Sequence, residues 1–268
     1  METLDSTRPD TGKAGGAKHQ SRASMLGSMA AGAFLAAAAA SPAAAQVRDA
    51  SGTYRTVMDT DILNFALNLE YLEAEFYNYS VFGKTIEQLG VPIGGRGQKG
   101  PTEGGAKTQF NNRFTYGTAE ELADDEQNHV LLLRSILGSD AVAKPAIDLD
   151  ALGMTPHMAQ FLVLARAFED TGVSAYGGAA PLIQSKDVLG YAARILAVEA
   201  YHAGNIRLMT AQFGLPTKRL DSKDILPPPS GKQYFTDDNR GLAVVRTPEE
   251  VLAIVRPFFP NGLNGAIR

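Results

Sequence analysis

The sequence predicts an all-α protein, a four-helix bundle built from two helical hairpins. Two observations indicate this class. Apolar residues recur at intervals of three and four along four long stretches, whereas the alternation typical of strands is almost absent. In addition, the residue pattern of the first two stretches recurs in the last two. We therefore expect a bundle core with approximate two-fold symmetry.

The first hairpin consists of two helices and the long segment between them. Its first helix, over 59–82, contains neither Gly nor Pro. Residues 83–117 are rich in Gly and read as a surface loop, whose length suggests a cover or a partner contact. Thr118 and Glu121 form a capping box that is expected to open the second helix, which ends near residue 137.

The second hairpin follows an irregular segment, 139–154, which is expected to carry the chain from one end of the bundle to the other. A Thr-Pro pair then opens a third helix over 155–176, with Thr155 as its cap, and two glycines end it. Ser185 is expected to cap the fourth helix, which runs to about residue 213 before another Gly.

Three segments follow from this organisation. Residues 1–45 read as an export signal that is removed, because a basic stretch leads into an alanine-rich run that is too short to span a membrane. A twin-arginine-like motif lacks its second Arg, which leaves the export route open. Residues 46–220 form the bundle, and 221–268 form a C-terminal extension packing on it, with a short helix capped by Thr247 and Glu250. We expect a periplasmic or extracellular mature protein that does not span a membrane.

Composition excludes several kinds of site. The net charge of −4 and the lack of a basic patch argue against nucleic acid as the partner. The absence of Cys excludes disulfides, thiolate zinc sites and cysteine-ligated iron centres. Any metal must therefore be held by oxygen and imidazole nitrogen.

Each hairpin supplies one helix with a lone core Glu and one helix with the motif Glu-x-x-His, whose spacing places both side chains on one helix face. Shifts of 73 and 99 residues bring the two halves into register. The predicted metal ligands are Glu70, Glu126, His129, Glu169, Glu199 and His202. Four carboxylates cancel the charge of two divalent ions, and oxygen-rich ligation with one imidazole per ion favours two Fe or two Mn ions over structural zinc.

Three further residues near these ligands have open roles. Glu73 lies one turn from Glu70 and is the alternative ligand of the first helix, although the repeat favours Glu70. Tyr77 and Tyr176 occupy equivalent positions in the two halves. They are expected to hydrogen-bond a ligand carboxylate, to take part in redox steps as catalytic residues, or simply to be buried with satisfied hydroxyls.

Other titratable residues are expected on the surface. Glu75 reads as part of a solvated face, and Asp125 and Asp170 point away from the ligands beside them in sequence. A surface position is expected for both Asp residues unless one of them orients a His. His157 is expected to be exposed, and His19 belongs to the leader.

The run Leu-Asn-Leu-Glu-Tyr-Leu-Glu-Ala-Glu-Phe-Tyr over 67–77 resembles the first helix of the exported ferritin-like group that includes the plant desiccation-related proteins. The paired Glu and Glu-x-x-His pattern is similar to that of ferritins, bacterioferritins, rubrerythrins and manganese catalases. The resemblance covers roughly 56–214 and implies a ferritin-like four-helix bundle with a di-iron or di-manganese site. Because Cys is absent, a peroxidase cycle would need an external reductant.

Two functional hypotheses follow. The first is a dinuclear non-haem metalloprotein that acts on dioxygen or hydrogen peroxide, as an oxidoreductase of the ferroxidase, peroxidase or manganese-catalase type. The second is a stress or desiccation-protective protein with a structural or absent metal and no catalysis. Burial discriminates between them, since an isolated group of buried carboxylates needs a cation. The choice of metal, the reaction and the oligomeric state, including a homo-oligomer, are left open.

Overall fold

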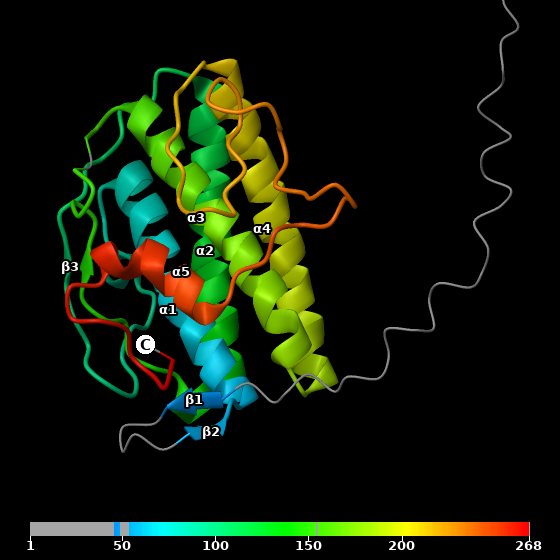
Figure 1. Ribbon diagram of the computed structural model, residues 1–268. Coiled ribbons are helices and arrows are strands. Elements are labelled where there is room, and N and C mark those ends of the chain that lie inside the picture. Colours follow the sequence, from blue (N-terminus) through cyan, green and yellow to red (C-terminus); the bar gives the residue numbers. More distant parts are fainter. Residues whose placement is uncertain (1–45, 49–53, 154, 268) are drawn as a thin grey trace, which may run out of the picture. The chain divides into compact units, whose positions relative to one another are not determined.

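The computed structural model describes residues 46–48, 54–153 and 155–267 (Figure 1). The predicted export signal over 1–45, with its His19, lies outside the described residues. Four long helices and a short fifth one are α1 (Asp59–Phe82), α2 (Arg113–Leu137), α3 (Met158–Ala179), α4 (Lys186–Gln212) and α5 (Pro248–Val255). α1 packs most extensively on α2, and α3 on α4, so the predicted all-α fold of two hairpins is confirmed.

The strands are short and lie outside the bundle core. β1 (Gln46–Arg48) pairs antiparallel with β2 (Tyr54–Thr56), and β3 (Thr102–Glu103) pairs parallel with β4 (Ile147–Asp148). β3 and β4 join the two long connections of the chain to each other. Within the described ranges, none of the helices combines the length and the apolar character that a membrane crossing requires.

Contacts at the helix ends fix the directions of the helices. Asn64, near the start of α1, donates from Nδ2 to the carbonyl of Asp140, just after α2, over 3.0 Å. At the opposite end, the amide of Thr108 donates to Ser80 O, and the amide of Gln109 donates to Pro156 O. α1 and α2 are therefore antiparallel, whereas α2 and α3 both start at this second end. The segment between α2 and α3 crosses the length of the bundle, as predicted.

Two helix starts differ from the sequence prediction. α2 begins six residues earlier than predicted because the side chain of Asn112 accepts hydrogen bonds from the amides of Phe114 and Thr115, so Thr118 lies within the helix. α3 begins after His157, which is exposed as predicted, and Thr155 instead hydrogen-bonds Gln160. The side chain of Asn112 thus caps α2 in place of Thr118, whereas the N-cap of α3, His157, makes no capping hydrogen bond through its side chain.

The Gly-Gly pair in α3 does not end the helix, which continues through it to Ala179. Gly178 instead allows the C-terminal segment to approach, because a Cβ atom there would lie 2.1 Å from the carbonyl oxygen of Arg246. The amide of Arg246 donates to Ser174 O over 3.0 Å, which fixes this segment on α3. The two glycines are therefore explained by close packing.

The long connection between α1 and α2 covers the outer face of α1. Ile86, Val91 and Ile93 are buried in this cover, and the amide of Ile86 donates to Glu75 Oε2 over 3.2 Å. Lys144 Nζ lies 3.7 Å from Glu75 Oε1. The prediction that Glu75 belongs to a solvated face is thus wrong, because helical periodicity does not reveal a loop that folds over the outer side.

A buried ion network ties the segment after α4 to the bundle. Arg207 Nη1 donates to Asp170 Oδ2 over 2.7 Å, and Arg166 Nη1 donates to Asp224 Oδ2 over 2.8 Å. All four side chains are at most 3% exposed. The surface position predicted for Asp170 is therefore wrong, since the C-terminal segment folds over that face and supplies Asp224.

We predict that Asp224→Ala lowers the free energy of unfolding by about 3–5 kcal/mol, because it leaves the buried guanidinium of Arg166 without this partner. Chemical denaturation measures the change. The matched control is Glu87→Ala, which removes an exposed ion pair with Lys99 and should cost about 1 kcal/mol or less. Equal effects of the two variants would contradict this role of Asp224.

Candidate metal centre

The side chains predicted as ligands come together where the four long helices face one another, each near the midpoint of its helix. α1 and α3 supply one carboxylate each, and α2 and α4 supply a carboxylate and an imidazole each. The cluster consists of Glu70, Glu126, His129, Glu169, Glu199 and His202. All four carboxylates are 0% exposed, and the two His residues are 7% and 6% exposed. The cluster is therefore removed from bulk water.

The cluster divides into two groups that share one residue. The first group is Glu70, Glu126, His129 and Glu199, and the second is Glu126, Glu169 and His202. Within each group, one ligand atom from every residue lies within 4.8 Å of the others. Glu126 belongs to both groups, so one carboxylate can contact two cations at once.

Both imidazoles face the carboxylates through Nδ1. His129 Nδ1 lies 3.0 Å from Glu126 Oε2 and 3.2 Å from Glu70 Oε2. His202 Nδ1 lies 3.1 Å from Glu126 Oε1 and 3.4 Å from Glu169 Oε2. The two imidazoles thus approach different oxygens of Glu126, and their ring centroids are 6.4 Å apart.

Several buried atoms of the cluster make no hydrogen bond of suitable geometry among the described residues, although some of them lie within 3.4 Å of one another. They are Glu70 Oε2, Glu126 Oε1, Glu169 Oε2, both carboxylate oxygens of Glu199, and His202 Nδ1. A buried polar atom without a partner is costly, and a cation is the partner that carboxylate oxygens and a neutral imidazole nitrogen share. The donor set fits two divalent cations, whose charge the four carboxylates would cancel.

Without a cation, protons take its place in the cluster. Burial, together with the charge of Glu126, raises the pKa of Glu70 to about 7. Burial by itself lowers the pKa of His129 and of His202, but the neighbouring carboxylates outweigh it and raise both values to about 12. Metal binding would therefore displace protons from the site.

Two tyrosines, one on α1 and one on α3, each donate a hydrogen bond to a cluster carboxylate on the other helix. The hydroxyl of Tyr77 on α1 donates to Glu169 Oε1 on α3, and the hydroxyl of Tyr176 on α3 donates to Glu70 Oε1 on α1. Burial, followed by the charge of the bonded Glu, raises the pKa of each Tyr well above its usual range. Both phenols therefore remain protonated and hold one oxygen of each carboxylate, which leaves the other oxygen directed into the cluster.

Asp125 orients the imidazole of His202. The sequence predicted a surface position for Asp125 unless it orients a His, and the structure shows this second case. Oδ2 of Asp125 lies 3.0 Å from His202 Nε2, and the side chain of Asp125 is 39% exposed. Because Nε2–H can donate to this carboxylate, Nδ1 of His202 is the nitrogen that would offer its lone pair to a cation once metal binding has displaced its proton. The repeat places Val198 at the position equivalent to Asp125, so the two halves differ here.

Glu73 is a further carboxylate at the edge of the cluster. It is 4% exposed, and burial, followed by the charge of Glu199, raises its pKa well above the usual value. Glu70 belongs to a ligand group and Glu73 does not, so the geometry favours Glu70 as the ligand of α1.

Gly172 makes room for these carboxylates and was not singled out from the sequence. A Cβ atom there would lie 2.4 Å from Glu199 Oε2 and 3.4 Å from Glu73 Oε1. A shift of 99 residues places Gly172 at the position of Glu73. This difference between the two halves was the sequence feature that could have singled out Gly172.

We predict that the metal-free protein loses stability as the pH rises from about 5 to about 8. A group whose pKa is raised on folding stabilises the fold below its ordinary pKa, and this stabilisation is lost as the pH rises through the raised value. Glu70, with a pKa near 7, and both His residues act in this direction. Thermal unfolding measured with and without bound metal checks the prediction; a flat profile for the metal-free protein would contradict it.

We also predict that Gly172→Ala weakens metal binding about tenfold while the fold remains intact. The added methyl group displaces the end of a flexible side chain, that of Glu199, and Ala is the better helix former by about 1 kcal/mol. Gly190→Ala on α4, where no atom lies within 4 Å of the added Cβ, is the control and should leave metal affinity unchanged. Metal titration combined with thermal unfolding separates the two effects, and unchanged affinity in Gly172→Ala would overturn the prediction.

Comparison with known proteins places this geometry in a family. The chain is 27% identical over 169 residues to the desiccation-related protein PCC13-62 of Craterostigma plantagineum, an alignment that covers 56% of this chain and 52% of that protein. It is 23% identical over 267 aligned positions to the ferritin-like catalase Nec2 of Nesocodon mauritianus, with coverage of 78% and 84%. The chain thus spans about half the length of the first relative. A family model described as a ferritin-like domain matches residues 58–212, which is more than half of the chain, and the chain therefore belongs to the ferritin-like domain family.

Proposed function

We propose that this protein binds two Fe or Mn ions in the described cluster and disproportionates hydrogen peroxide. The observation that carries the proposal is the set of unpartnered, buried oxygen and nitrogen atoms that converge on Glu126 from four helices. Two adjacent redox-active ions would supply the two-electron chemistry that an O–O bond requires. Export of the mature chain remains a prediction from residues 1–45.

Peroxide disproportionation fits the composition of the chain. Two hydrogen peroxide molecules give one dioxygen and two water molecules, so one peroxide is oxidised, the other is reduced, and no external reductant is needed. The chain has no Cys that could ligate an iron centre for electron transfer. The name of one relative, a ferritin-like catalase, supports the same reaction.

The protein side chains have distinct roles in this proposal. Glu126, which belongs to both ligand groups, would help to hold both ions. Asp125 holds His202 in one tautomer and orientation, through a carboxylate that is partly exposed to solvent. Tyr77 and Tyr176 limit the movement of the carboxylates to which they donate. The apolar core around the cluster keeps bulk water away from the ions.

A protective protein without catalysis is the second candidate. The name of the desiccation-related relative favours it, although the alignment covers only 52% of that protein. An assay of dioxygen release from hydrogen peroxide decides between the two candidates. A protective protein would release no dioxygen after loading with either metal.

We predict that Glu126→Ala abolishes binding of both ions, whereas Glu169→Ala removes only one. Glu126 is shared by both groups, and Glu169 belongs to the second group alone. Elemental analysis of purified, metal-loaded protein should give about two ions per wild-type chain, about one for Glu169→Ala and none for Glu126→Ala. An oxygen electrode then records the release of dioxygen from hydrogen peroxide, an activity that both variants should lose. Two ions retained in Glu126→Ala, or no peroxide decay by the loaded wild type, would contradict the proposal.

A further inference from the structure

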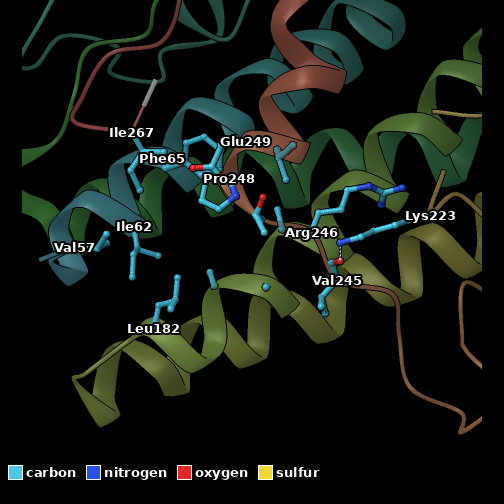
Figure 2. A pocket seen from close by; sticks show the side chains of 15 residues that line it. Val57, Ile62, Phe65, Leu182, Lys223, Val245, Arg246, Pro248, Glu249 and Ile267 are labelled. Atoms are coloured by element: carbon cyan, nitrogen blue, oxygen red, sulfur yellow. Dashed lines mark hydrogen bonds between the residues drawn. The ribbon is translucent and has the colours of Figure 1, made fainter. Parts of the chain in front are cut away.

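A cavity of about 380 Å³ lies between α1, α3 and the start of α5 (Figure 2). Ile62 and Phe65 of α1 form one wall, and small residues of α3 form the other, with Ala175 and Ala179 among them. Lys223 and Glu249, which are both exposed, and the buried Arg246 are its charged lining residues. Most of the other lining residues are apolar.

The two cationic side chains that line the cavity are paired with other protein groups. Lys223 Nζ donates to Glu250 Oε2 over 2.6 Å and to the carbonyl of Val245 over 3.2 Å. Arg246 donates to Asp221 from both Nε and Nη2, over 2.7 and 2.9 Å. With these charges satisfied within the protein, the cavity suits a small uncharged molecule better than an anion.

A second, smaller cavity of about 30 Å³ adjoins the first one. The two share Ile62, Phe65, Ala175 and Ala179 as lining residues. Tyr176 also lines the smaller cavity, and its hydroxyl donates to Glu70 in the cluster. The apolar space thus ends at a side chain that itself touches a candidate metal ligand.

The other half of the bundle is filled at the equivalent place. Phe76 and Phe161 stack there beside Tyr77, with ring centroids 5.4 Å apart. A shift of 99 residues places Ala175 at the position of Phe76, and Phe161 at the position of Ile62. The half that contains Tyr176 therefore has no aromatic ring at these two positions, and the cavities occupy that side of the bundle.

We propose that these two cavities bind dioxygen and carry it between the protein surface and the Tyr176 side of the centre. Dioxygen is uncharged and needs no hydrogen bonds, so it enters an apolar cavity at little cost, whereas hydrogen peroxide would lose its hydrogen bonds to water. The purpose of the route rests on the proposed function, in which dioxygen is the product. Binding of dioxygen in the cavity does not depend on that function.

The absence of Trp from the chain permits a direct test of dioxygen binding. Phe65→Trp places a single fluorophore in the wall shared by both cavities, and Phe161→Trp places one in the filled half as the matched control. Fluorescence quenching by dioxygen is measured on the full chain with its metal and again after chelation. We expect several-fold faster quenching for Phe65→Trp than for Phe161→Trp, and acrylamide, a polar quencher, should not reproduce the difference.

Refilling the cavity tests the route. Ala175→Phe restores the ring that the other half has at this position, and Ala179→Leu is the milder variant should the larger ring disturb folding. Either change should slow quenching in the Phe65→Trp background and slow the oxidation of Fe(II)-loaded protein by dioxygen, while metal content stays unchanged. Equal quenching by dioxygen at the two Trp positions would contradict the binding of dioxygen in the cavities. A refilled variant that shows slower quenching but still oxidises Fe(II) at the wild-type rate would contradict the proposed route to the metal centre. Failure of the proposed function would instead appear as absent metal with the quenching difference intact.

Discussion

The structure depends on one electrostatic constraint: four carboxylates are buried at the centre of a helical bundle and must be neutralised there. Glu70, Glu126, Glu169 and Glu199 are 0% exposed, and ionised carboxylates in such surroundings are strongly destabilising unless cations or protons accompany them. The two imidazoles, the two tyrosine hydroxyls and the space left by Gly172 all serve this constraint. Two bound divalent cations would satisfy this constraint without the protons that the cluster otherwise retains.

The parts of the chain outside the four helices maintain the burial on which this constraint rests. The connection between α1 and α2 covers the outer face of α1 and buries Glu75, while the segment after α4 closes over Asp170 through Arg166, Arg207 and Asp224. Both covers use polar side chains that find partners inside the protein, and the first cover also buries Ile86, Val91 and Ile93. The bundle core consequently remains shielded from water on faces that four helices alone would leave open.

The sequence was sufficient to predict those helix bounds, caps and site residues that depend on local pattern or on the internal repeat. The bounds of α1 and the caps of α4 and α5 follow from periodicity and end signals, and the six clustered side chains follow from matching Glu70 with Glu169 and the two Glu-x-x-His motifs. What it missed depends on contacts between distant segments. Gly178 reads as a helix end until the approach of Arg246 is known, and Asp170 reads as a surface residue until Asp224 is placed beside its network. The predicted start of α2 was wrong for a local reason, because Asn112 and not Thr118 caps the helix.

Crystallography of the metal-loaded chain, with anomalous diffraction recorded at the Mn and Fe absorption edges, would show whether the cluster binds two ions. We expect two anomalous peaks at one of these edges, one beside His129 and one beside His202, with Glu126 in contact with both. A single peak outside the cluster, or ordered water in place of metal after anaerobic loading with both ions, would contradict this expectation.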